Sequence, residues 1–234
     1  MDIVLVPGLW LNASTWDAVV PVLTEAGHRC RPLTLPGMES QASDRAGITL
    51  SDHVAAVVEA LDDSADRVLL VGHSAGCGIA HAALDARPDR VARVVHIGGF
   101  PGGDGEPLLS GLPAANGEVA MPDWASIGEE ANIVDFSPAQ LADFYAAAIP
   151  VPEGVLTEPV RLSDPRRHDV PVTMVCPEYR ADDLRGWVEG GEPSLAELAQ
   201  IGSVTYVDLP AGHWPQLTRP GDLAQVILDA ATGT

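Results

Sequence analysis

The sequence of 234 residues contains no lysine, and all 13 of its positively charged residues are arginines. Without an amine side chain the protein cannot form a Schiff base with a carbonyl substrate. The 33 acidic residues give a net charge of −20, which disfavours binding to nucleic acids, to anionic membrane surfaces and to highly anionic substrates. The expected partner is therefore a small-molecule substrate, not a nucleic acid or a membrane.

Cysteine is scarce, and long apolar runs are missing. Cys30, Cys77 and Cys176 lie far apart, and neither a Cys-x-x-Cys pair nor a His/Cys cluster indicates a metal site. The apolar runs stop well short of the roughly 20 residues that a membrane helix needs. The first residues, MDIVLVPG, lack the basic region and the cleavage site of a signal peptide. We therefore expect a soluble, cytoplasmic protein with reduced thiols, no metal and no cofactor.

Short apolar segments alternate with segments of helical periodicity along most of the chain. Strands are predicted at residues 2–8, 28–37, 67–72, 91–100, 170–176 and 203–210. Helices are predicted at residues 14–27, 49–63, 75–88, 137–148, 182–190, 194–202 and 219–232. This alternation predicts a single α/β domain over residues 1–234, with a mostly parallel six-stranded sheet and helices on both faces.

Residues 101–169 interrupt this alternation between the fourth and fifth predicted strands. The segment is rich in glycine, proline and acidic residues. Its one clear helix begins with Ser137, a potential cap, and with Pro138 in the first turn. The segment is too long for an ordinary loop in a compact domain. We therefore expect residues 101–169 to form a lid over a functional site.

The pentapeptide Gly72-His73-Ser74-Ala75-Gly76 fits the pattern G-x-S-x-G and falls between a predicted strand and a predicted helix. A serine on such a sharp turn requires small neighbours because the backbone is strained there. The helix that follows directs its N-terminus at the serine, where negative charge develops when a carbonyl is attacked. Ser74 is therefore the predicted nucleophile.

Three stretches resemble the α/β-hydrolase superfamily: VLVPGLWLNASTWDAVVPVLTEAGHRC at 4–30, VGHSAG at 71–76 and GHWPQLTRP at 212–220. Within it, the chain is most similar to the small plant-type methylesterases and hydroxynitrile lyases and their bacterial relatives. The resemblance covers nearly the whole chain outside the predicted lid and implies the α/β-hydrolase fold. It also implies an oxyanion site formed by the backbone N–H groups of Leu9 and Ala75.

The same resemblance implies that the base is a histidine in the loop after the last strand. His213, in LPAGHWPQ, meets that requirement among the seven histidines. His73 also lies beside Ser74 but is expected to point away from it on the tight turn. Trp10 follows the oxyanion loop and Trp214 follows the base, so both are predicted to line the substrate pocket.

The acid of the triad is less clearly marked. Tyr179 occupies the position, shortly after the fifth strand, where the family has an aspartate. Glu178 is adjacent, and its longer side chain can reach His213, so it is the favoured candidate. The alternatives that stay open are Asp104 or Glu106 after the fourth strand, Asp182 or Asp183 one helical turn further on, or no acid at all.

These residues predict a serine esterase that cleaves a small apolar carboxylic ester through an acyl-enzyme on Ser74. Cyanohydrin cleavage is not expected, because hydroxynitrile lyases of this type carry a threonine at the position of Gly8 and a lysine at that of Trp214. The missing aspartate leaves two other functions open. One is a lyase, or a cofactor-free cyclase or oxygenase, on the same scaffold. The other is a non-catalytic protein that binds a small molecule.

Overall fold

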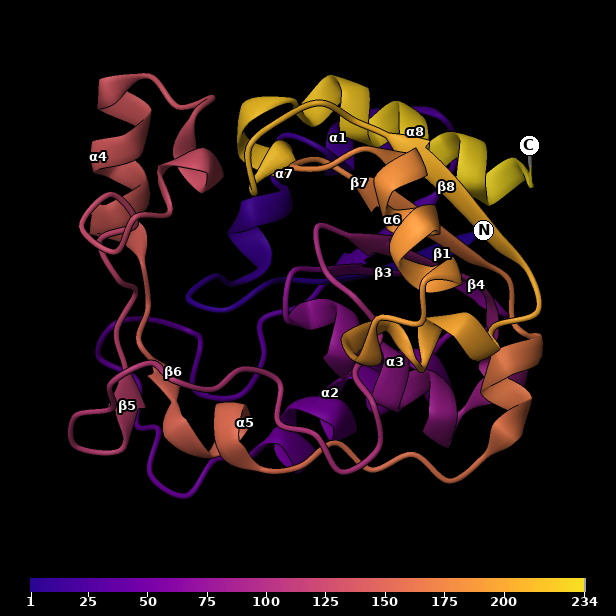
Figure 1. Cartoon of the computed structure of the whole chain (residues 1–234), viewed down its shortest axis with the longest axis horizontal. Helices are drawn as coiled ribbons and strands as arrows, with labels where there is room; N and C mark the ends of the chain where they lie inside the picture. The colour runs from indigo at the N-terminus through magenta and orange to yellow at the C-terminus, as the bar shows by residue number, and fades with distance from the viewer. Residues whose placement is uncertain (234) are drawn as a thin grey trace.

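The computed structural model describes residues 1–233 and has a central sheet with helices on both faces (Figure 1). The strands of this sheet are β1 (Asp2–Val6), β2 (Arg29–Pro32), β3 (Val68–His73), β4 (Val91–Ile97), β7 (Val172–Cys176) and β8 (Val204–Asp208). They lie in the order β2-β1-β3-β4-β7-β8, and every neighbouring pair is parallel. The predicted parallel sheet of six strands is confirmed.

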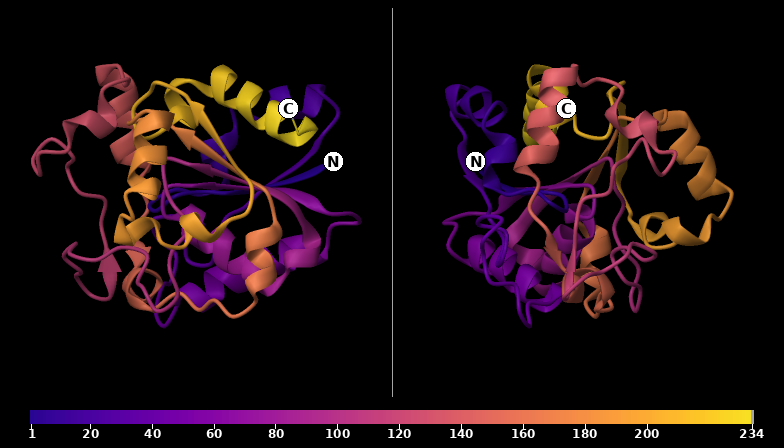
Figure 2. Two further views of the ribbon diagram at one scale, coloured as in Figure 1. Left: turned by 45° about the vertical axis from the view of Figure 1, so that its right-hand side comes forward. Right: turned by 90° about the vertical axis from the view of Figure 1, so that its left-hand side faces the viewer.

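Successive side chains along the strands point to opposite faces of the sheet and pack into two separate apolar cores. In β1, Ile3 and Leu5 face one core, whereas Val4 and Val6 face the other. The first core is covered by α1 (Val20–Glu25) and α8 (Pro220–Thr232). The second is covered by α2 (Leu50–Asp62), α3 (Gly76–Ala86) and α6 (Ala181–Glu189). In Figure 1, α1 and α8 lie above the sheet and α2 and α3 lie below it, and Figure 2 gives two rotated views.

Two predicted helices differ in the structure: one is divided and shortened, and the other forms no α-helix. The segment 14–27 divides into a 3-10 turn, Ala13–Trp16, and α1, which carries Pro21 in its first turn. Proline lacks an N–H and cannot sit in a helix interior, so the helix starts again just before it. The segment 194–202 contains only two 3-10 turns, Pro193–Leu195 and Leu198–Gln200.

The segment between β4 and β7 includes residues 101–169, which we call the insertion. It contains the antiparallel pair β5 (Glu118–Val119) and β6 (Val151–Pro152), α4 (Pro138–Ala147) and α5 (Glu153–Thr157). α4 starts as predicted, with the Ser137 hydroxyl accepting a hydrogen bond from the Gln140 N–H at 3.3 Å. β5, β6 and α5 are too short to leave a periodic pattern in the sequence, and they were not predicted.

A further helix, α7 (Pro215–Thr218), lies between β8 and α8. Across residues 1–233, no helix combines the length and the apolar composition needed to cross a membrane.

Candidate active site

Ser74 lies at the carboxyl end of β3, immediately before α3. Its φ is +53°, in the left-handed region that residues with a side chain seldom adopt. Its N–H donates to the carbonyl oxygen of Ile97 at the end of β4, at 2.8 Å. The turn that carries Ser74 is therefore the strained strand-to-helix turn that the G-x-S-x-G pattern predicts.

The glycines of this turn are required by close approach of the backbone. A Cβ atom on Gly76 would lie 2.4 Å from the Pro7 carbonyl oxygen, and one on Gly72 would lie 2.7 Å from the Gly76 carbonyl oxygen. Both obstacles are backbone atoms, so no change of rotamer relieves the contact. A larger residue at position 76 would displace the loop after β1, which carries Leu9, and a larger residue at position 72 would displace the start of α3.

His213 lies in the loop between β8 and α7 and bridges Ser74 and Glu178. Ser74 Oγ donates to His213 Nε2 at 2.8 Å, and His213 Nδ1 donates to Glu178 Oε2 at 2.6 Å. Because the carboxylate accepts the Nδ1 proton, Nε2 is left as the acceptor for the serine hydroxyl. The His213 and Glu178 side chains are 17% and 21% exposed, so both are largely shielded from water.

Neither acidic residue in the first turn of α6 reaches His213. Asp182 pairs with Arg185 on the same helix at 2.6 Å, and its side chain is exposed. Asp183 Oδ2 accepts from the Arg180 N–H at 3.3 Å at the start of the helix. Both carboxylates therefore bind groups of α6 or of its first turn, and neither is available to His213.

The candidates after β4 also lie apart from His213. Asp104 Oδ1 accepts from the Leu162 N–H at 2.8 Å within the insertion. Glu106 lines a cavity next to Ser74 but forms no hydrogen bond with His213. Tyr179, at the position usual for the acid, has a buried hydroxyl without a partner in the described part of the chain, and burial raises its pKa.

His73 points away from Ser74, as predicted, and it holds the backbone of the His213 loop. Its Nε2–H donates to the His213 carbonyl oxygen at 2.8 Å, and its Nδ1 accepts from the Gln216 side chain at 3.2 Å. Complete burial and, to a smaller extent, the neighbouring His213 lower the pKa of His73 to about 3, although the bond to the carbonyl oxygen opposes this shift. Gln216 was not predicted, because a polar side chain three residues after His213 is the sole sign of it in the sequence.

The insertion also contacts the His213 loop. The His213 N–H donates to the Asn132 carbonyl oxygen at 2.9 Å, and the Gly212 N–H donates to Asp135 Oδ2 at 2.9 Å. Arg219 lies 3.7 Å from the same Asp135 carboxylate. Residues 132–135 carry no periodic pattern, so this link was not visible in the sequence.

His168, at the end of the insertion, belongs to a buried cluster of charged residues. Glu197 accepts from His168 and from His81 at 2.9 Å, and from Arg167 Nε at 2.6 Å. Burial alone would raise the pKa of Glu197, but these three hydrogen bonds together hold it well below its usual range. The cluster fastens the insertion to α3. No group of three or more histidine, cysteine, aspartate or glutamate side chains within residues 1–233 is arranged to hold a metal.

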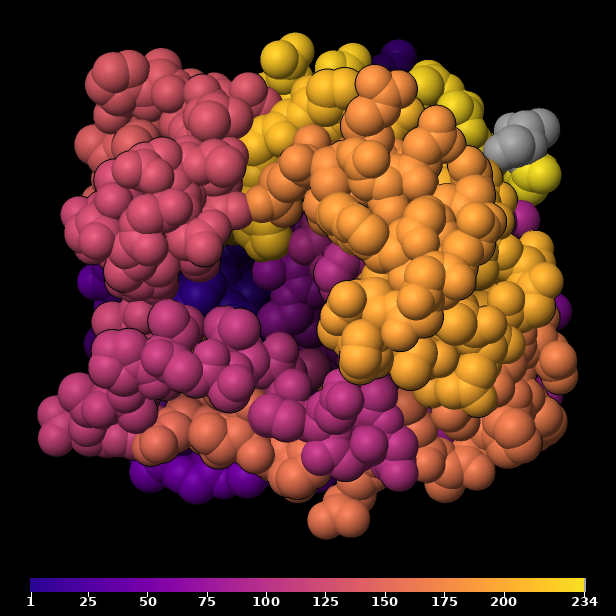
Figure 3. Space-filling view, viewed as in Figure 1, coloured from indigo at the N-terminus to yellow at the C-terminus, as the bar shows by residue number. Residues whose placement is uncertain are grey.

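A cavity of about 370 Å³ opens beside Ser74. Leu9, Ala75 and His213 line it together with the serine. Neither the Leu9 N–H nor the Ala75 N–H donates to an acceptor anywhere in residues 1–233, so both donors are available to a ligand. The space-filling view shows the molecule hollowed between the insertion and the carboxyl-terminal half of the chain (Figure 3).

Of the two tryptophans predicted to line the pocket, Trp10 lines this cavity and Trp214 does not. Trp214 is 2% exposed and packs against Phe144 of α4, with 4.6 Å between ring centroids. Its predicted place in the pocket is therefore corrected, because the aromatic side chains of the insertion bury its indole. Trp124, also from the insertion, lines the cavity instead.

The comparisons with known proteins agree with this architecture. The sequence profile described as the alpha/beta hydrolase family matches residues 3–226. The chain is 27% identical over 247 residues to a protein named pyrethroid hydrolase from Sphingobium wenxiniae, covering 98% of this chain and 87% of that protein. It is 28% identical over 262 residues to methylesterase 7 of Arabidopsis thaliana, covering 97% of this chain and 95% of that protein.

Among solved structures, an extracellular alpha/beta-hydrolase from a Paenibacillus species superposes with a TM-score of 0.78 at 21% identity. The match covers 99% of this chain and 98% of that one. The parallel sheet, the serine turn at the end of β3 and the profile match over almost the full length lead to one conclusion: this chain belongs to the α/β-hydrolase family.

Proposed function

We propose that the protein is a serine esterase that hydrolyses small, apolar carboxylic esters. The observation that carries this proposal is the series of hydrogen bonds from Ser74 through His213 to Glu178 beside a cavity. Among the lining residues in the described part of the chain, Glu106 is the one acidic side chain, and no arginine lines the cavity. The names of the relatives, a pyrethroid hydrolase and a methylesterase, support ester hydrolysis as the reaction class.

In the proposed mechanism, Ser74 Oγ attacks the ester carbonyl while its proton passes to His213 Nε2. Glu178 stabilises the imidazolium that forms, because its carboxylate accepts the Nδ1 proton at 2.6 Å. The N–H groups of Leu9 and Ala75 bind the developing oxyanion. His213 then protonates the leaving alcohol, and a water molecule hydrolyses the acyl-enzyme with His213 again as the base.

The insertion serves as a lid in this proposal, within a single domain that spans residues 1–234. Trp124 and Leu108 of the insertion form part of the cavity wall, and residues 132–135 contact the His213 loop. A cytoplasmic location is part of the same proposal. It is supported by three free cysteines, of which Cys77 and Cys176 are buried.

The reason to keep a lyase or cofactor-free cyclase or oxygenase, or a non-catalytic binding protein, as an alternative function is the missing aspartate. Glu178 reaches His213 from the neighbouring position, so that reason no longer applies. No feature of the cavity favours either alternative over ester hydrolysis.

Hydrolysis of p-nitrophenyl acetate by wild type and by Ser74→Ala tests the proposal. Loss of the nucleophile should lower kcat by at least about 10³-fold, since the triad acts as a unit. A fluorophosphonate should label wild type at Ser74 and leave the variant unlabelled. Equal turnover by the two proteins, or labelling that persists in Ser74→Ala, would contradict the proposed role of this serine.

A further inference from the structure

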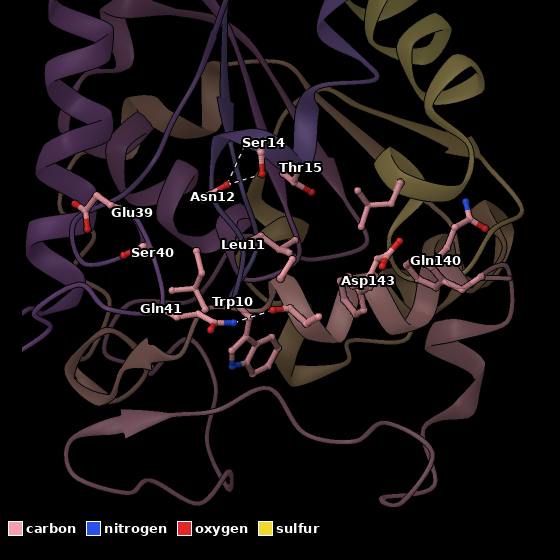
Figure 4. A pocket seen from close by; sticks show the side chains of 16 residues that line it. Trp10, Leu11, Asn12, Ser14, Thr15, Glu39, Ser40, Gln41, Gln140 and Asp143 are labelled. Carbon is pink, nitrogen blue, oxygen red and sulfur yellow. Dashed lines mark hydrogen bonds between the residues drawn. The ribbon is translucent and has the colours of Figure 1, made fainter. Parts of the chain in front are cut away.

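Trp10 lines two cavities that share no other residue. The first is the cavity beside Ser74, and the second has a volume of about 590 Å³. Figure 4 shows the second cavity, with Trp10 on one side and Asp143 and Gln140 of α4 on another. The two cavities are thus neighbours that meet at Trp10.

The floor of the second cavity is apolar, and its rim is polar. Trp10, Phe144 and Ile149 supply buried apolar surface. The Gln41 side chain closes one edge, because its amide donates to the Ala146 carbonyl oxygen at the end of α4 at 2.8 Å. A cavity with an apolar floor between two elements is suited to a flexible chain or a ring.

The insertion fixes Trp10 in its place between the cavities. The indole Nε1–H donates to the Val119 carbonyl oxygen at 3.0 Å, and the Trp10 carbonyl oxygen accepts from the Ile149 N–H at 2.9 Å. Trp124 packs edge-on against the indole, with 5.7 Å between ring centroids. The backbone of Trp10 has a φ of +63°, and the side chain is 4% exposed. A residue held in a strained conformation by so many contacts keeps a defined orientation.

We infer that the Trp10 indole is the partition that restricts the enzyme to short esters, and that the second cavity accepts a longer substrate chain once this indole is removed. The inference rests on the proposed esterase function and adds a residue that determines specificity. Trp10 acts through its bulk, since the reacting atoms are contacted by Ser74, His213 and the donors of Leu9 and Ala75.

The charges of the second cavity define which longer chains it takes. Of the 16 residues that line it, Glu39 and Asp143 are the charged ones, and both are exposed at the rim. Neither carboxylate forms an ion pair in the described part of the chain. The chain end that extends into this cavity is therefore uncharged or cationic, whereas an ω-carboxylate is repelled.

The test compares p-nitrophenyl esters from acetate to decanoate in wild type and in Trp10→Gly. Glycine opens the partition and tolerates the positive φ, which offsets part of the lost packing. Each methylene that enters an apolar cavity favours binding about fourfold. The ratio of kcat/KM for octanoate to that for acetate should therefore rise at least about tenfold in Trp10→Gly. Trp10→Leu, a milder opening, should give a smaller rise and serves as well if the glycine variant is unstable.

Two matched substitutions on α4 distinguish the second cavity from a general loosening of the site. Ala147 lines the cavity, whereas Ala142 is exposed on the same helix and does not. Adding Ala147→Phe to Trp10→Gly should abolish the gain on octanoate, and adding Ala142→Phe should preserve it. An unchanged octanoate-to-acetate ratio in Trp10→Gly overturns the inference. So does a selective loss of octanoate hydrolysis in the Ala147→Phe single variant, because the cavity would then already be in use.

Calorimetric binding of linear alkan-2-ones separates this inference from the proposed function. These compounds carry a carbonyl group but no leaving group, so they report on chain length without turnover. A gain in affinity for decan-2-one over butan-2-one in Trp10→Gly supports the partition even if wild type shows no Ser74-dependent hydrolysis. No such gain overturns the partition even if wild type is an active esterase.

Discussion

Replacing Glu178 by glutamine removes the charge that faces His213 Nδ1 and keeps the length of the side chain. The wild-type contact is 2.6 Å, with both side chains mostly shielded from water. The glutamine amide can donate to Nδ1, which would move the ring proton to Nε2. In that tautomer Nε2 no longer accepts the proton of Ser74 Oγ.

The size of the expected fall in kcat follows from the positive charge that His213 acquires when Ser74 attacks the ester. An imidazolium and a carboxylate with charge centres about 4 Å apart attract each other by about 4 kcal/mol at an effective dielectric constant of 20. Loss of that attraction in the transition state corresponds to about 10³-fold in rate. The same substitution of the triad acid in a serine protease lowers turnover about 10⁴-fold. We therefore expect kcat of Glu178→Gln to fall between about 10²- and 10⁴-fold.

The assay is steady-state hydrolysis of p-nitrophenyl acetate, with KM and kcat determined separately. KM should change little, because the lost interaction forms fully only in the transition state. Asp182→Asn is the matched control: it removes a carboxylate that pairs with Arg185 on α6 and should keep kcat within about twofold. If Glu178→Gln retains kcat within about threefold of wild type while Ser74→Ala is inactive, Glu178 does not orient the base.

Two further predictions concern stability. Gly76→Ala should lower the free energy of unfolding by about 1–3 kcal/mol and abolish esterase activity, because the new methyl group would lie 2.4 Å from the Pro7 carbonyl oxygen. In Gly186→Ala in α6 the new methyl group meets no neighbouring atom within 4 Å, and urea denaturation should show a free energy of unfolding about 0.5–1 kcal/mol higher than that of wild type. If Gly76→Ala were the more stable of the two variants, the contact with Pro7 would not explain why position 76 needs glycine. His73 has a pKa of about 3 in the folded state and about 6.5 when unfolded. The unfolded chain therefore binds the extra proton between these values, and stability should fall as pH drops from 6.5 towards 3, by about 1.4 kcal/mol per pH unit for this group. His73→Gln should show a correspondingly shallower slope between pH 6 and pH 4, and an unchanged slope would argue against a buried neutral His73.

The sequence offered several candidates for the acid of the triad but did not decide among them. The sequence left carboxylates after two different strands open, Asp104 and Glu106 after the fourth and Glu178, Asp182 and Asp183 after the fifth, and the reach and direction of each side chain decided among them. Glu178 turns towards His213, whereas the neighbouring Tyr179 is buried on the other side. Successive residues after a strand point in different directions. The sequence alone therefore does not show whether a carboxylate one position before the usual one faces His213, and the structure is needed to decide this.

Trp214 shows a different limit. Its position next to His213 suggested a pocket residue, yet Phe136 and Phe144 of the insertion cover its indole. These aromatic contacts join residues about 70 or more positions apart, and the insertion has little periodicity from which its packing could be predicted. The same applies to Asn132, whose carbonyl oxygen accepts from the His213 N–H, and to Gln216, which donates to the His73 ring that holds the His213 carbonyl oxygen.

The sequence by itself determined the alternation of strands and helices, the parallel sheet and the turn that carries Ser74. These features depend on local patterns: apolar periodicity, glycines where backbones meet, and a proline or a cap at a helix start. Only the tertiary structure decided which carboxylate meets His213 and which tryptophan separates two cavities. Both outcomes depend on side chains that approach through space from distant segments, and no local pattern encodes the distance between them.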